Sequence, residues 1–270
     1  MTPLEAYYHA RCEEYEEALR SVLHRISPEA IHSLRVAVKK IRALFDLINK
    51  PLSAFEFKKT FAPFKEAFKA AAAIRNLDIT ITLIKKLADK HDSNTTEILS
   101  LLKKKKRERI PELKHVTSIA LSRGNIFSEE IAEIMRTSIA EQDILNFLEH
   151  VRLEIEDIAA KHPSVENMHT TRKLLKQYFY IAAMHGGSAE QTALGPLGAI
   201  NTAQHLLGCW HDVVIAHGVL GELVASDALE KKIAAPVLDL LQDEEERRRT
   251  KARNALAEIS FLNDNEVASN

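Results

Sequence analysis

Residues 31–42 read IHSLRVAVKKIR, and residues 168–176 read MHTTRKLLK. Three basic residues keep the same spacing at an offset of 137: His32, Arg35 and Lys39 recur as His169, Arg172 and Lys176. A second match, at an offset of 136, aligns Phe64–Asp78 with Ile200–Val214. Because the two offsets agree to within one residue, the sequence predicts an internal repeat with halves 1–141 and 142–270.

The composition around these segments favours an all-α fold. Of the 270 residues 46% are hydrophobic, only 6% are aromatic, and seven of the eight glycines lie at or after Gly186. Such a chain has little of the turn chemistry that strands need. We expect two pseudo-symmetric four-helix bundles, with Ser27 as a helix N-cap and Pro28 as the first helical residue.

Breaks at proline, glycine and polar residues predict the limits of the helices. The expected helices span about 4–25, 28–50, 53–73 with a bend near Pro63 and a continuation after Asn76 to 91, 93–121 with a kink at Pro111, 128–140, 143–161, 164–185, 196–217, 221–235 and 236–262. We expect turns at 123–125 and 162–164, a loop at 186–195 and a frayed tail from Asn263.

The repeated segments predict a basic surface in each half. On a helix, the side chains of His32, Arg35, Lys39 and Arg42 fall within about 80° of one another, and no acid occurs between residues 30 and 44. We call these four residues, together with His169, Arg172 and Lys176, the basic wedges. Like charges at these spacings repel one another on a helix, so the wedges predict a multivalent anion as partner. Two wedges across a pseudo-twofold axis would line one shared groove.

An apolar stripe accompanies the first wedge on a separate face of its helix, formed by Ile31, Leu34, Val38, Ile41 and Phe45. This spacing predicts packing in the core. Other basic residues are candidates at the margin of the groove: Lys40, Lys65, Lys69 and Arg75. The runs 103–109 and 247–253 are interpreted as solvated faces, and the sequence leaves open whether they join the site.

Two further features have structural interpretations. His205, His211 and His217 lack the spacing of helical metal pairs, so no metal or cofactor is expected. Asp212 beside the single tryptophan, Trp210, is interpreted as part of a turn or cap, and Trp210 as a core residue.

The motif from His32 to Arg42 resembles the signature of the conserved histidine α-helical domain, known as CHAD. Phe64–Asp78 and Leu206–Asp212 are similar to the family's second motif, so the likeness covers essentially the whole chain. The resemblance implies two helical bundles around a basic cavity that binds inorganic polyphosphate. It implies as ligands His32, Arg35, Lys39, Arg42, His169, Arg172 and Lys176, followed by Lys65 and Arg75.

The chain departs from the family pattern at several positions: Gln177 and Phe179 replace basic residues, Ala72 a glycine, Asn76 an acid, and Asn201 stands opposite Lys65. Family members often follow a triphosphate-tunnel (CYTH) domain, whose strand motif is Glu-x-Glu-x-Lys. The nearest string is Glu154-Ile155-Glu156, without the lysine and inside an expected helix. We therefore expect a stand-alone binding module and no enzyme.

Three other functions remain open at this stage. A histidine phosphotransfer protein would use His32 or His169, but Val36 and Lys173 stand where a small residue is usual. RNA binding by the same groove would need aromatic residues among the basic ones for base stacking, and the wedges have none. A polyphosphate hydrolase would need carboxylates to hold Mg²⁺.

The location and assembly of the protein are less constrained. The acidic N-terminus does not resemble a signal peptide, and no run approaches the roughly 18 apolar residues of a membrane span. Cys12 and Cys209 form no disulfide framework. We expect a cytoplasmic protein with no membrane partner; the sequence leaves its oligomeric state open.

Overall fold

The structure is a computed structural model that describes residues 2–52, 55–123, 126–160, 164–186, 191–192 and 195–259. In these ranges the chain is all-α apart from one antiparallel pair of two-residue strands. The elements in chain order are α1 (Pro3–His24), α2 (Pro28–Asn49), α3 (Phe57–His91), α4 (Thr96–Ser122), α5 (Glu129–Thr137), α6 (Glu141–Ala160), α7 (Val165–Gly186), β1 (Gln191–Thr192), β2 (Gly195–Pro196), α8 (Leu197–Ala225) and α9 (Lys231–Ala257).

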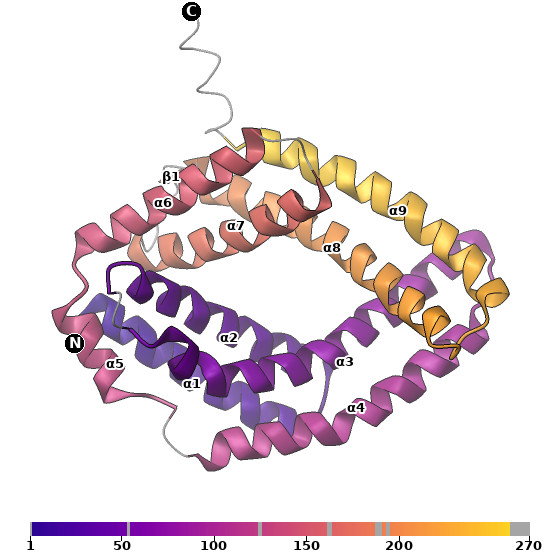
Figure 1. Ribbon diagram of the computed structural model, residues 1–270, viewed down its shortest axis with the longest axis horizontal. Coiled ribbons are helices and arrows are strands. Elements are labelled where there is room, and N and C mark those ends of the chain that lie inside the picture. The colour runs from indigo at the N-terminus through magenta and orange to yellow at the C-terminus, as the bar shows by residue number, and fades with distance from the viewer. Residues whose placement is uncertain are drawn as a thin grey trace, which may run out of the picture.

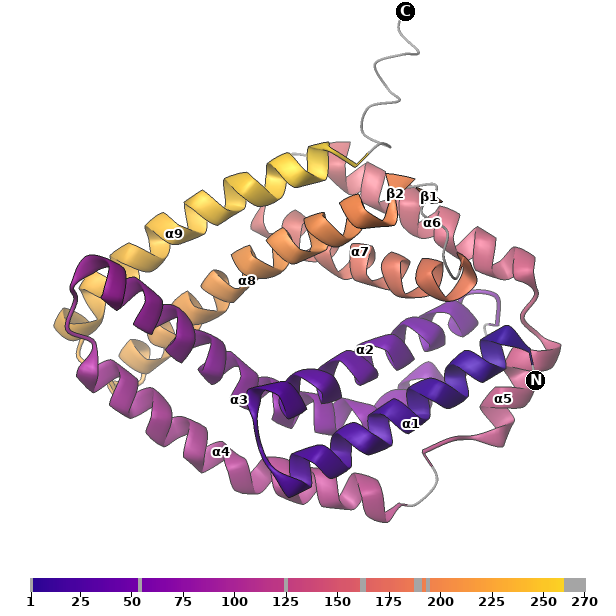
Figure 2. The same ribbon diagram turned by 180° about the vertical axis from the view of Figure 1, so that it is seen from behind.

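The helices follow a flattened ring with two long sides (Figure 1). Helices α1 to α4 form one side and α6 to α9 the other, and the view from behind shows the same arrangement (Figure 2). The short helix α5 joins the sides at one end, and the hairpins α3–α4 and α8–α9 meet at the other. Helices α2, α3, α7 and α8 lie on the inner side of the ring, with α2 contacting α7 and α3 contacting α8.

The helices that carry the repeated segments have matching limits. An offset of 137 residues relates both ends of α2 to both ends of α7. Helix α2 begins as predicted, since the Ser27 hydroxyl accepts a hydrogen bond from the Ala30 amide at 3.2 Å and Pro28 follows as the first helical residue. The predicted apolar stripe is confirmed, because each of its five side chains exposes at most 1% of its surface.

The ring contains two hydrophobic cores. The larger one is built by α1, α2, α5, α6 and α7, with parts of α3, α4, α8 and α9. The smaller one joins the far halves of the hairpins α3–α4 and α8–α9. On α3 the boundary between the cores falls between Ile74 and Leu77, and on α8 it falls between Trp210 and Val213. The polar residues at these two boundaries are therefore at equivalent places, 136 residues apart.

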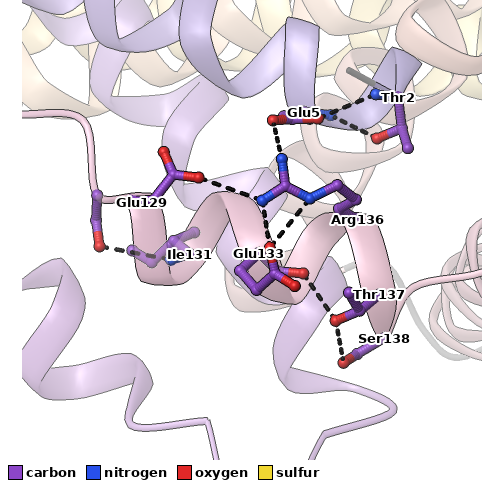
Figure 3. A network of polar contacts seen from close by, with 9 residues as sticks. Thr2, Glu5, Glu129, Ile131, Glu133, Arg136, Thr137 and Ser138 are labelled. Carbon is purple, nitrogen blue, oxygen red and sulfur yellow. Dashed lines mark hydrogen bonds and ion pairs between the residues drawn. The ribbon is translucent and has the colours of Figure 1, made fainter.

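Helix α5 is fastened to the start of the chain by a charged network (Figure 3). The Arg136 guanidinium donates to the buried Glu5 carboxylate at 2.9 Å and lies 3.2 Å from Glu129. It also pairs with Glu133, one turn earlier in α5. Glu5 in turn completes a capping box with Thr2 at the start of α1. These contacts fix the link between the two sides of the ring to the α1 terminus.

Several predicted breaks are wrong. Helix α3 runs without interruption through residues 74–76, where Ile74 is fully buried. Helix α8 continues through Gly218 and Gly221. A helical glycine costs about 1 kcal/mol, but the fully buried Ala216 and Leu220 pack the same stretch into the smaller core.

Other limits also differ from the prediction. Helix α9 begins at Lys231 and contains Pro236, which was expected to start it. The predicted loop 186–195 includes the last residue of α7, strand β1 and the first residue of β2. Pro63 and Pro111 lie inside α3 and α4 as expected. The predicted tail, the turn residues 124–125 and residues 162–163 lie outside the described residues. No helix in the described part of the chain combines the length and apolar character needed to cross a bilayer.

Substitution of the buried stripe tests this packing. Ile41→Ala should lower the free energy of unfolding by about 2–5 kcal/mol, because the emptied space cannot fully collapse. Ser33→Ala, on the exposed face of the same helix, should change it by less than about 0.5 kcal/mol. Denaturant unfolding followed by circular dichroism measures both. Equal effects of the two substitutions would contradict the assignment of the stripe to the core.

Candidate functional site

The basic wedges of the two halves meet where α2 and α7 come together on the inner side of the ring. The two helices are in contact, and the Gln177 side-chain amide on α7 donates to Asp46 on α2 at 3.0 Å. Arg35 and Lys39 on α2 interact electrostatically with Arg172 and Lys176 on α7. We call these four residues the cation cluster. Sequence reasoning predicted all four, and the structure brings them together.

The cations of this cluster are half-buried and repel one another. Burial, together with the charges of Lys176, Arg35 and Arg172, lowers the pKa of Lys39 to about 6. Burial and the nearby arginines lower the pKa of Lys176 to about 8, against the opposing effect of Asp212. Both causes favour the neutral amine. In the protein without a bound anion, Lys39 therefore holds its proton much less firmly than an ordinary lysine.

Polar atoms around the cluster are buried without hydrogen-bond partners. They are Arg35 Nη1, Arg172 Nε, Trp210 Nε1 and His211 Nδ1. Buried polar groups are normally satisfied, so each such atom requires an explanation. The Arg35 guanidinium lies 4.5 Å from the centre of the Phe68 ring, a cation–π contact that orients it without using its N–H groups. Acceptor oxygens of an anion bound beside Arg35 and Arg172 would satisfy the two guanidinium donors, whereas the Trp210 indole is fully buried in the core.

The histidines of the wedges occupy the edge of the cluster. His169 packs against Trp210 and His211, with ring centres 4.9 and 4.7 Å apart. Burial and neighbouring cations lower the pKa of His32 and of His169. The same causes lower the pKa of His211 to about 3. All three imidazoles are therefore neutral near pH 7 in the free protein.

Residues at the core boundary complete the site. The charge of Arg75 on α3 lowers the pKa of Arg35, with an effect second only to that of burial. Asp212 on α8 interacts with Arg35 and Lys39 from α2 and with Arg172 and Lys176 from α7. Burial raises the pKa of Asp212, while Arg75, Arg172, Arg248 and Lys176 oppose this rise. The site is thus a positive cluster, and Asp212 is the carboxylate that interacts with all four of its cations.

Sequence reasoning missed the place of two of these residues, Asp212 and Arg248, in the site. Asp212 is in the middle of α8, so its interpretation as a turn or cap is wrong, whereas that of Trp210 as a core residue is confirmed. The signal for Asp212 was the alignment of His211-Asp212 with Arg75-Asn76 at the repeat offset. Arg248 belongs to a run interpreted as a solvated face, yet its side chain is only 15% exposed. It donates to Glu244 and to the Cys209 carbonyl at 2.6 and 2.8 Å.

Four other candidates have different surroundings. Lys40 pairs with Glu14 of α1 at 3.1 Å, Arg42 pairs with Asp46 at 3.7 Å, and Lys69 pairs with Glu66 at 3.4 Å. Lys65 is exposed on α3. The structure does not connect these residues to the cation cluster, and their part in binding stays a prediction. From the other basic run, Lys106 contacts the buried Asp78.

Two solved structures share this fold over nearly the whole chain. The crystal structure of the CHAD domain from the plant Ricinus communis matches with a TM-score of 0.77 at 19% identity, covering 95% of this chain and 91% of that chain. PptA from Streptomyces chartreusis matches with a TM-score of 0.67 at 17% identity, covering 95% of this chain and 97% of that chain. At these identities the likeness shows the fold alone.

Sequence comparison supplies the family. A search of curated proteins finds no match. The model of the CHAD domain matches residues 6–221, a range that includes α2, α7 and the core boundaries on α3 and α8. The chain therefore belongs to the CHAD domain family.

Proposed function

We propose that this protein binds inorganic polyphosphate at the cation cluster, as a binding module without catalytic activity. The observation that carries the proposal is the burial of Arg35, Lys39, Arg172 and Lys176 against one another, with Asp212 as the carboxylate that interacts with all four. Repulsion at such a site is relieved when an anion binds. The resemblance to CHAD proteins carries the same expectation.

The arrangement of the donors favours a long anion over a single phosphate. Arg35 and Lys39 are one turn apart on α2, and Arg172 and Lys176 repeat that spacing on α7. Arginine offers paired N–H groups to phosphate oxygens, and lysine offers a point charge. A flexible chain with a charge on every unit can engage both helices at once, whereas orthophosphate can reach only part of the cluster.

Direct titration tests the proposal. Calorimetry with long-chain polyphosphate, tripolyphosphate, ATP and RNA should show the tightest binding for long polyphosphate. Raising the salt from about 50 to 200 mM should weaken this binding at least about tenfold, because several cationic contacts release counterions. Samples kept with polyphosphate and Mg²⁺ should release no orthophosphate. Preference for RNA, salt-insensitive binding or steady phosphate release would each contradict a part of the proposal.

Both halves should contribute to binding. Arg35→Ala and Arg172→Ala should each lose roughly 1–3 kcal/mol of binding free energy, as expected for a charge-assisted contact. Neither change should reduce helicity, because each removes a buried charge from a repelling cluster. Arg20→Ala, on an exposed arginine of α1 that pairs with Glu16, is the control and should bind normally. Normal binding by a folded Arg172→Ala protein would refute a site shared by the two halves.

Binding should strengthen as the pH falls from about 8 to 6. In the free protein, the pKa of Lys39 is lowered to about 6, that of Lys176 to about 8, and that of His32 and His169 below the ordinary value. A polyanion raises these pKa values, so binding takes up protons and lower pH favours the complex. Isothermal titration in buffers of different ionisation enthalpy measures the uptake.

Two variants assign the titrating groups. Lys39→Arg keeps its charge over this range, and the double variant His32→Gln, His169→Gln cannot charge at either position. Each should flatten the pH profile in proportion to its share of the proton uptake. Profiles as steep as that of the unmodified protein in both variants would assign the effect to Lys176, His211 or Asp212.

A further inference from the structure

Asp212 occupies an unusual position for an acid in this protein. It is half-buried in the middle of α8, at the boundary between the two cores. Cations from four other helices interact with it electrostatically: Arg35 and Lys39 on α2, Arg75 on α3, Arg172 and Lys176 on α7, and Arg248 on α9. Contacts place two of these helices beside it, since the His169 ring lies 4.7 Å from that of His211 and Arg248 donates to the Cys209 carbonyl at 2.8 Å. No other residue in the described part of the chain is shown to interact with all six.

The Asp212 carboxylate is not committed to any of these cations. Among the described residues, no ion pair within 4.0 Å involves Asp212. The other acids at buried positions behave differently: Asp78 pairs with Lys106, and Glu244 pairs with Arg247 and Arg248. Asp212 therefore lowers the positive potential of the cluster without occupying its donors, two of which, on Arg35 and Arg172, stay unpartnered.

We propose that Asp212 is a resident counter-anion that makes the site selective for long polyphosphate chains. The inference rests on the proposed function. In the free protein its charge offsets part of the repulsion among the six cations. When a phosphate group enters, the same charge repels it. A short anion that binds beside Asp212 meets this repulsion with all of its charge, whereas a long chain can place most of its phosphates along α2 and α7 and reduce that repulsion.

The counter-anion has a distinctive consequence for binding. Removing its charge leaves the cations of the free protein less compensated, but it also removes the desolvation cost that raises the pKa of Asp212, so affinity and not stability is the quantity that reveals its role. The site then attracts every phosphate more strongly, and the gain is largest for anions confined to its middle. A residue that only holds α8 in place would lower stability and binding together.

Asp212→Asn tests this role because asparagine keeps the shape of the side chain and removes its charge. At constant pH and salt, the affinity for tripolyphosphate should rise about threefold or more, as expected for like charges at about a nanometre in partly screened surroundings. The affinity for long polyphosphate should rise less, so the ratio between the two ligands falls.

Asp239→Asn is the matched control, since Asp239 is exposed on α9 and its replacement changes the net charge by the same amount. It should leave both affinities and their ratio unchanged. Equal gains in the control would show an effect of net charge and overturn the proposal. If Asp212→Asn alone does not fold, it is combined with Lys39→Met, so that one cation is removed together with the anion. The double variant is then compared with the Lys39→Met protein.

The outcomes separate this inference from the proposed function. If the unmodified protein does not bind polyphosphate, the proposed function fails and the inference fails with it. If the unmodified protein binds, and Asp212→Asn binds both ligands as tightly as the unmodified protein or more weakly, only the inference fails. An unchanged ratio with higher affinity for both ligands would overturn the selectivity and leave Asp212 as a general brake on binding.

Discussion

The structure depends on holding several positive charges close together inside a helical protein. Arg35 and Lys39 on α2 face Arg172 and Lys176 on α7, and burial alone would favour losing their charges. Lysine can respond by releasing its proton, and the pKa of Lys39 near 6 reflects this response. Arginine cannot. The charges that persist in the free protein near neutral pH are therefore those of the arginines and of Lys176, and they must be balanced by the surrounding structure.

The division of the hydrophobic core provides a place for these charges. A single continuous core would have to bury the cations among apolar side chains, at a high desolvation cost. Instead, the larger core ends at Ile74 on α3 and at Trp210 on α8, and the smaller core begins at Leu77 and Val213. Long helices that cross from one core to the other keep the polar interval rigid, because packing on both sides fixes their orientation. This arrangement orders the cation cluster without ion-pairing its members.

The sequence was informative where a pattern has a single physical reading. The apolar stripe of α2 and the basic residues beside it fixed both the core face and the four members of the cation cluster. Local breakers were less reliable: Gly218 and Gly221 remain helical because Ala216 and Leu220 pack in the smaller core. Asp212 could not be assigned by its neighbours in the chain, since its partners lie on α2, α3, α7 and α9. Arg248 lies in a basic run directly after the acids 243–246, so its half-buried position could not be predicted from the sequence.

The two core boundaries show how the halves differ electrostatically. At equivalent places α3 carries Arg75-Asn76 and α8 carries His211-Asp212. With a pKa near 3, His211 is neutral, so α8 contributes one negative charge where α3 contributes one positive charge. A second copy of Arg-Asn would have made the site more positive by two charges. Two residue differences at the boundary thus moderate the buried charge, while the phosphate-binding candidates on α2 and α7 keep their identities and spacing. Because the moderating charge lies on a helix that bears none of those four cations, it can change without any change in the residues that would contact the ligand.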